Sequence, residues 1–344
     1  MIRLGVLDQS PVPHGSNAAT ALADTVALAV ETERLGYGRY WLAEHHNTDS
    51  LAGTSPEVLA ASVAGATSRI RVGSGGVMLS HYSPFRVAEV FRTLDALYPG
   101  RIDLGVGRAA GTDAATEAAL RYSGEAQPEE YFARRLIDLV GFLGRGFKAT
   151  SRFAGVRAMP DAGVRALPDG RIGGGPELWM LASSGHGGSN AASLGLPLCF
   201  AHFITPRWSG QVVSEYRRRF SPSSVSDAPR AMLAVGVMCA PTDDEARHLA
   251  ASAELWRMHP EGQERGPLLD PDTASQAMAQ WSELERDLAA QHRQGVLVGD
   301  PERVTSGLAE LAESHQVDEL LIVTVSHDPE ARRRSYRLLA EQLW

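Results

Sequence analysis

Lysine is nearly absent from this 344-residue chain, in which Lys148 is the only lysine among 33 Lys and Arg residues. Schiff-base and P-loop mechanisms both need a lysine at the reacting centre, so each has a single candidate, in a region that we expect to be peripheral. Net charge is −8 and no cluster of basic residues stands out, which argues against binding to nucleic acid or an anionic membrane. Small-molecule chemistry is the default expectation.

Cysteine and long apolar runs are also scarce. Cys199 and Cys239 each lie in a separate apolar run, so we expect both to be reduced residues of buried strands, as in a cytoplasmic protein. No apolar run is long enough to span a bilayer. The first residues pass directly into a strand pattern, so we expect no signal peptide.

Short apolar strands alternate with helical patterns along most of the chain. With 44% apolar residues the chain can bury a large core. A strand followed each time by a helix requires parallel pairing, and this favours a TIM (β/α)8 barrel forming a single domain over 1–344. The predicted strands span residues 2–7, 39–42, 71–79, 102–106, 178–182, 198–203, 232–239 and 319–325.

Two segments interrupt this alternation and are predicted to be insertions after strands four and seven. The first, at about 150–176, is rich in Gly, Pro and Arg and contains a short tandem repeat at 155–162 and 163–170. Such a short repeat cannot form a solenoid, so it predicts an inserted hairpin or a mobile excursion. The second insertion, at about 250–297, is polar and largely helical.

The segment Glu44-His45-His46 follows the apolar strand at 39–42. Barrel enzymes keep their chemistry at this end of the strands. Two imidazoles beside a carboxylate are suited to proton transfer, metal ligation or anion stabilisation, and the sequence does not choose among them. Alternatively, one imidazole only bonds backbone while the other faces solvent.

Two glycine-rich segments fall at the ends of later strands. Gly75-Gly76 would let a flat ligand lie on the peptide plane, or would form a bulge needed for barrel closure, and the two readings are equally favoured. The turn from Ser183 to Ser189, with the hydroxyl of Ser184, is a candidate phosphate cradle, although simple helix capping would also explain it. Arg108 adds a cation suited to phosphate.

These segments together resemble the bacterial luciferase-like, flavin-dependent monooxygenases, over nearly the whole chain. The strongest match is the Glu-His-His segment that begins at Glu44. Further matching segments are residues 73–79, 84–89, 98–108, 176–185, 298–302 and 317–320. Each motif alone is unspecific, but their combination and order are specific to the family.

The resemblance implies an FMN site at the carboxyl ends of the barrel strands. The peptide between Gly75 and Gly76, expected as a non-proline cis bond, would support the flavin ring. His45, oriented by Glu44, would be the catalytic imidazole near its reactive edge. The phosphate would be held by Arg108, Ser183, Ser184 and Gly187. Reduced FMN would react with O₂ to a C4a-hydroperoxide that oxygenates a small organic substrate.

Two departures from bacterial luciferase bear on the reaction. Gly107 replaces a reactive cysteine, and Ser183 replaces an acidic residue before the phosphate-site serine. Light emission is therefore not implied. The resemblance favours a tailoring step of secondary metabolism, such as hydroxylation, epoxidation or Baeyer-Villiger oxygenation.

Three other functions remain open at this stage. They are deazaflavin (F420)-dependent hydride transfer on a related barrel, flavin binding without catalysis, and hydrolysis with Glu44, His45 and His46 as metal ligands. Adjacent residues rarely converge on one ion, so we expect no metal. We expect Met78, Tyr82 and Trp179 to line the substrate pocket. The family also implies a separate flavin reductase and a homodimer.

Overall fold

Nine parallel strands form one sheet in the computed structural model, which describes residues 2–109, 112–121, 129–144, 146–161, 163, 165–166, 172–259 and 266–343. Eight of them close into a barrel, because β8 also pairs with β9 and β11 pairs with β1. In barrel order they are β1 (Arg3–Asp8), β2 (Arg39–Leu42), β3 (Arg71–Met78), β4 (Ile102–Gly107), β7 (Glu177–Ala182), β8 (Leu198–Ala201), β9 (Ala231–Cys239) and β11 (Glu319–Val323). The TIM-barrel prediction is confirmed.

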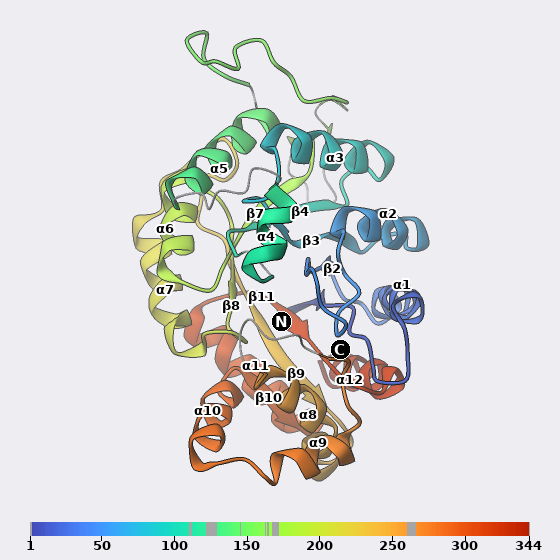
Figure 1. Ribbon diagram of the computed structural model, residues 1–344. Helices are drawn as coiled ribbons and strands as arrows, with labels where there is room; N and C mark the ends of the chain where they lie inside the picture. The colour runs from blue at the N-terminus through green and yellow to red at the C-terminus, as the bar shows by residue number, and fades with distance from the viewer. Residues whose placement is uncertain are drawn as a thin grey trace.

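Helices cover the outside of the barrel, with α1, α2 and α3 on one side of the strands and α6 and α7 on the other (Figure 1). Helices that directly follow a strand include α1 (Ala18–Arg34), α2 (Pro56–Ala66), α3 (Pro84–Leu97), α6 (Gly185–Leu194), α7 (Pro206–Arg219), α11 (Pro301–His315) and α12 (Pro329–Leu343). Two more, α4 (Ala114–Arg121) and α5 (Glu129–Leu143), follow β4. Among the described residues, no helix is long and apolar enough to cross a membrane.

Strand alternation divides the core into two layers. In β7, Leu178 and Met180 point outward and pack in the layer between strands and helices. Trp179 and Leu181 point inward and join the core inside the barrel. The predicted buried, unpaired cysteine Cys199 belongs to this inner core.

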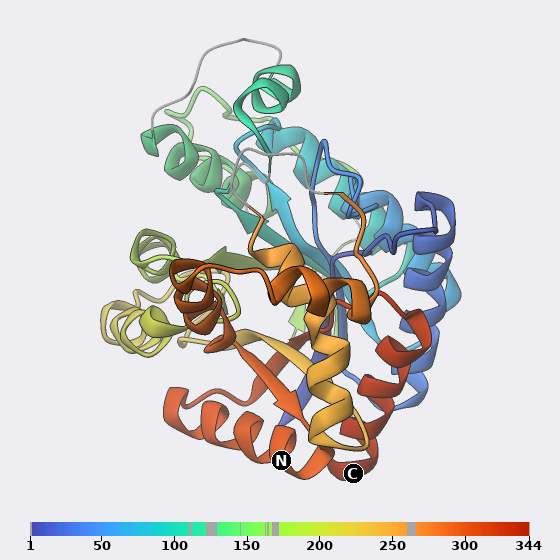
Figure 2. The same cartoon turned by 60° about the horizontal axis from the view of Figure 1, so that its bottom comes forward.

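The two insertions follow β4 and β9, the fourth and seventh strands of the barrel, as predicted. The first contains the antiparallel hairpin of β5 (Arg165–Ala166) and β6 (Ile172–Gly173), although residues 162, 164 and 167–171 of the repeat region lie outside the described part. The second contains α9 (Pro271–Met278) and α10 (Glu283–Arg293), after α8 (Asp243–Arg257). It ends in a strand that the sequence did not reveal, β10 (Val296–Gly299), which pairs with β9 (Figure 2).

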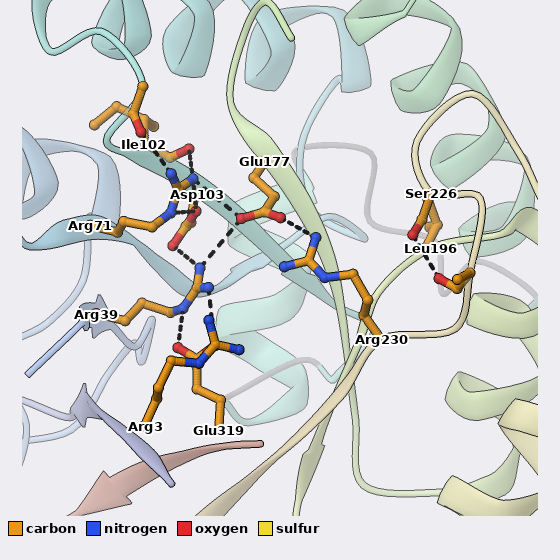
Figure 3. A network of polar contacts seen from close by, with 12 residues as sticks. Arg3, Arg39, Arg71, Ile102, Asp103, Glu177, Leu196, Ser226, Arg230 and Glu319 are labelled. Atoms are coloured by element: carbon orange, nitrogen blue, oxygen red, sulfur yellow. Dashed lines mark hydrogen bonds and ion pairs between the residues drawn. The ribbon is translucent and has the colours of Figure 1, made fainter. Parts of the chain in front are cut away.

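A buried network of charged side chains lies at the amino ends of the barrel strands (Figure 3). Arg39 Nη1 is 2.5 Å from Asp103 Oδ2, and Arg39 Nε is 2.7 Å from Glu319 Oε1. Arg71 and Glu177 extend the network. Each charge has an opposite partner, which is the condition under which ionised side chains can be buried.

This network makes a prediction about acid stability. Burial alone would raise the pKa of the Glu319 carboxyl, but the neighbouring Arg39 holds that pKa below its ordinary value. A carboxyl with a depressed folded pKa contributes stability that is complete above its unfolded pKa and is lost as the pH falls through the folded value. We expect urea denaturation from pH 7 to pH 3 to show a shallower loss of stability in Glu319→Gln than in the parent protein. Parallel loss in both proteins would contradict this.

Candidate functional site

Glu44 joins the loop after β2 to the end of β3. Its carboxylate is buried, with only 2% of the residue exposed. One oxygen, Oε1, lies 2.6 Å from the Tyr82 hydroxyl and 2.8 Å from His46 Nε2. The other accepts the Met78 amide N–H at 2.9 Å. Because a carboxylate accepts but does not donate hydrogen bonds, these three groups act as donors toward it.

His46 is an imidazole that Glu44 contacts in this hydrogen-bonded group. Residues two apart in an extended chain point to the same side, which brings His46 toward Glu44. The orientation of His45 by Glu44 stays a prediction. His45 is half-buried, and its backbone N–H donates to the carbonyl of Gly53 at 2.8 Å.

The Tyr82 hydroxyl donates a hydrogen bond to the Glu44 carboxylate. Burial raises the pKa of the Tyr82 hydroxyl, and its hydrogen bond to Glu44 raises it further. The hydroxyl therefore keeps its proton throughout the physiological range. Tyr82 and Met78 both lie beside Glu44, and their place in the substrate pocket stays a prediction.

Trp179, predicted to line the substrate pocket, points into the barrel. It is 2% exposed and belongs to the inner core. The guanidinium groups of Arg39 and Arg230 each lie 5.0 Å from its ring centroid, so the ring packs beside the charged network. Contact between Trp179 and a substrate stays a prediction.

The peptide between Gly75 and Gly76 has the cis geometry that the resemblance implied. Both glycines are partly exposed, unlike most of β3, and the pairing of β3 with β4 changes register between Ser74 and Val77. A Cβ at Gly75 would lie 2.4 Å from Leu7 Cδ1, and one at Gly76 would lie 2.7 Å from the Gly105 carbonyl oxygen. Side chains are sterically excluded here, so a bare peptide surface is exposed.

The amino end of α6 offers a second exposed polar surface. Ser184 is the N-cap residue, and its side chain makes no capping hydrogen bond. The first N–H groups of a helix have no partner within the helix, and the helix dipole favours an anion there. Gly187 must be a glycine, because a Cβ would lie 2.5 Å from that of Ala182. The Thr205 hydroxyl fixes the turn by donating to the Ser183 carbonyl at 2.6 Å.

Arginines gather near the ends of β3 and β4. Arg108 is exposed just after β4, and its carbonyl accepts from the Ser80 hydroxyl at 3.3 Å. Arg135 on α5 donates to the carbonyl of Ser80. Burial lowers the pKa of Arg135, and the nearby positive charge of Arg121 lowers it further. Two adjacent guanidinium groups favour an anion between or beside them.

The sequence reading missed Arg121 and Arg135. Arg121 Nη2 pairs with Glu117 on the same helix, while its Nε is buried without a hydrogen-bond partner. No signal in the sequence distinguishes these two from the many arginines on exposed helix faces. Among the described residues, no group of three or more His, Cys, Asp or Glu side chains is arranged to hold a metal ion.

The closed parallel barrel, with its polar and glycine-rich segments at the carboxyl ends of β2, β3, β4 and β7, is the architecture of a (β/α)8-barrel enzyme. Sequence comparison identifies the family of barrel enzymes to which the chain belongs. The chain belongs to the luciferase-like monooxygenase family, whose sequence model matches residues 2–318. Membership of this family indicates that the protein is an oxidoreductase.

Several relatives match the chain almost end to end. The uncharacterized protein YwcH of Bacillus subtilis (strain 168) is 41% identical over 343 residues, which cover 99% of each chain. N-acetyl-S-alkylcysteine monooxygenase of the same organism is 35% identical over 348 residues, covering 99% of this chain and 98% of the relative. The crystal structure of apo-MsnO8 superposes with a TM-score of 0.88 at 39% identity and covers 99% of this chain and 98% of MsnO8.

More distant solved structures share the fold alone. They include the oxygenating constituent of 3,6-diketocamphane monooxygenase in complex with FMN, at 18% identity and a TM-score of 0.68. An F420-dependent secondary alcohol dehydrogenase has the same TM-score at 13% identity. Fold likeness therefore does not distinguish FMN from F420.

Proposed function

We propose that the protein is an FMN-dependent monooxygenase that uses reduced FMN and O₂ to oxygenate a small organic substrate. The observation that carries this proposal is the pairing of the bare Gly75–Gly76 peptide with the uncapped amino end of α6 on one rim of the barrel. Their strands, β3 and β7, are separated only by β4. In a ligand that joins a flat ring to a phosphate, the ring would lie on the Gly75–Gly76 peptide and the phosphate would bind at the amino end of α6.

The residues present fit such a group. Ser183, Ser184 and Gly187 would bind the phosphate through hydroxyl and backbone N–H groups, and Arg108 would add a positive charge. Arg121, with its unpartnered buried Nε, is a second candidate guanidinium. Gly75 and Gly76 would lie against the ring, since no side chain can intervene there.

Bound reduced FMN would supply two electrons to O₂, so that one oxygen atom enters the substrate and the other leaves as water. The protein groups around it have separate tasks. Glu44 fixes His46 and Tyr82, and His45, the neighbouring imidazole on the same loop, is the candidate for moving a proton at the reacting centre. Such chemistry needs the rim to hold these groups in place and to limit the access of water.

For the substrate we propose a thioether as the first class to test. The reason is the 35% identity to an N-acetyl-S-alkylcysteine monooxygenase over nearly the whole chain. Oxygen-dependent product formation from an N-acetyl-S-alkylcysteine, with a flavin reductase supplying reduced FMN, is the assay. The same assay distinguishes the monooxygenase from a flavin-binding protein without catalysis.

We also propose a homodimer that pairs through α2 and α3. Large apolar side chains are exposed on both helices, with Val58 61% and Leu97 63% exposed. A symmetric dimer would cover them. Light scattering of the parent protein and of a Val58→Asp, Leu97→Asp double variant tests this, because the charges would oppose burial.

The phosphate site gives a sharper prediction. In Ser184→Ala, FMN should bind about tenfold more weakly, which corresponds to about one hydrogen bond to a charged group, while riboflavin, which lacks the phosphate, should bind as it does to the parent protein. Ser189→Ala, an exposed serine on the same helix, is the matched control. Fluorescence titration gives both affinities, and equal weakening for FMN and riboflavin would exclude Ser184 from the phosphate site. Tighter binding of F420 than of FMN would favour the hydride-transfer alternative.

A further inference from the structure

Two loops that are far apart in the sequence are tied together at the rim. Asn47 Nδ2 donates to Asp113 Oδ2 at 2.9 Å, and Thr112 Oγ1 donates to the carbonyl oxygen of His46 at 3.2 Å. We call Asn47, Thr112 and Asp113 the rim clasp. One side of the clasp belongs to the loop after β2, which carries both histidines, and the other belongs to the segment that leads from β4 into α4.

The topology shows what the rim clasp must cross. In the barrel β3 lies between β2 and β4. A contact between the loops that follow β2 and β4 therefore passes over the carboxyl end of β3, the strand that contains Gly75 and Gly76. Figure 1 accordingly shows α4 in front of the strands. The clasp thus spans the edge of the proposed flavin site.

Asp113 connects the clasp to α4. Its carboxylate accepts the N–H groups of Ala115 and Thr116 and the hydroxyl of Thr116, so it also caps the helix. Hydrogen bonds from Asn47 and Thr116 hold the pKa of the Asp113 carboxyl well below its usual range. The group remains an ionised acceptor at neutral pH, and one side chain joins the helix to the histidine loop.

Asn47 is suited to its side of the contact. Its φ is +50°, in the left-handed region that asparagine and aspartate enter more easily than other residues with a side chain. Two separate sets of contacts therefore hold the histidine loop. Glu44 anchors His46 toward β3, and the clasp anchors the His46 carbonyl and the next residue toward α4.

We propose that the rim clasp is a positioning device that couples docking of α4 over the end of β3 to the placement of His45 and His46. The idea rests on the proposed function, because it concerns the same site. Its three members are positioning residues that act through the histidine loop. Loss of the Asn47–Asp113 contact would release α4 and the histidine loop together, although Asp113 would still cap the helix.

The donor and the acceptor of the Asn47–Asp113 hydrogen bond can be exchanged by swapping the two side chains. Asn47→Asp alone places two carboxylates against each other, which opposes the contact. Asp113→Asn alone is mild, because the amide of Asn47 can turn its oxygen toward the new donor. In the double variant Asn47→Asp, Asp113→Asn the donor and acceptor are exchanged, and the new asparagine still caps α4.

Hydrogen exchange of the flavin-free protein, read over residues 44–53 and 112–121, is the first measurement. We expect Asn47→Asp to raise exchange about tenfold in both segments, Asp113→Asn to change it little, and the double variant to return both to parent values. A rise confined to 44–53, or no recovery in the double variant, would overturn the proposal. If Asn47→Asp proves too unstable to study, Asn47→Ala keeps the helix cap and must still show the joint rise.

Activity and flavin binding separate this proposal from the proposed function. In the thioether assay, kcat should fall in Asn47→Asp and recover in the double variant, with FMN affinity within about threefold of the parent. Absence of FMN binding by the parent protein would refute the proposed function. The hydrogen-exchange measurements would still test the rim clasp, because they use the flavin-free protein. Normal FMN binding and turnover in Asn47→Asp would refute the clasp alone.

Discussion

Asp103→Ala should lower the free energy of unfolding by about 3–5 kcal/mol, the usual effect of removing one partner from a buried ion pair. The Asp103 side chain is completely buried and accepts hydrogen bonds from Arg39, Trp41 and Arg71. Without it, two guanidinium groups at the base of the barrel keep their charge and lose their shared acceptor. This is the largest stability effect that we expect from a single substitution.

Urea denaturation followed by circular dichroism measures this change. Asp244→Ala is the matched control, because Asp244 is also paired with an arginine but its side chain is 94% exposed. Exposed ion pairs contribute little, so the control should unfold as the parent does. Equal midpoints for the Asp103 and Asp244 variants would show that the network does not support the barrel.

Glu44→Ala should lower kcat/KM in the thioether assay by about 100-fold, the effect of a small misplacement of reacting groups. The substitution removes the acceptor shared by His46, Tyr82 and the Met78 amide. Three donors at the ends of β2 and β3 would then lose the atom that fixes them. FMN affinity should change little, because Glu44 is not among the proposed phosphate or ring contacts.

Asp49→Ala serves as the control for Glu44→Ala, since it removes an exposed carboxylate from the same loop. Its turnover should match that of the parent protein. Glu44→Gln should lie between the two, because the amide oxygen still accepts from some donors while its nitrogen cannot. Parent-like turnover in Glu44→Ala would remove Glu44 from the functional site.

The strands of the barrel could be predicted because each is a short apolar run bounded by turn residues. Most helices could be predicted because their apolar residues recur at helical spacing. β10 could not, because a four-residue strand at the end of a polar, helical stretch gives little periodic signal. The direction in which Trp179 points could not be predicted for a related reason. Every residue from Leu178 to Ala182 is apolar, so the sequence does not show which ones face the barrel interior.

The local backbone geometry of the candidate site was predictable where it depends on neighbouring residues. Glycines at 75 and 76 and the Gly-rich start of α6 are such cases. The partner of Glu44 depended on which way consecutive side chains point, and the Asn47–Asp113 contact joins residues 66 positions apart. Contacts of this kind depend on how the loops fold over the ends of the strands, and the strand pattern in the sequence does not define those loop conformations.

Our central proposal is that FMN binds at the carboxyl ends of the strands, with its ring on the Gly75–Gly76 peptide and its phosphate at the start of α6. A crystal structure of the protein soaked with FMN tests this most directly. We expect the phosphate within hydrogen-bond distance of Ser184 and the backbone of Gly187, and the ring in contact with Gly75. FMN bound elsewhere, or a metal ion in contact with Glu44 and His46, would contradict the account.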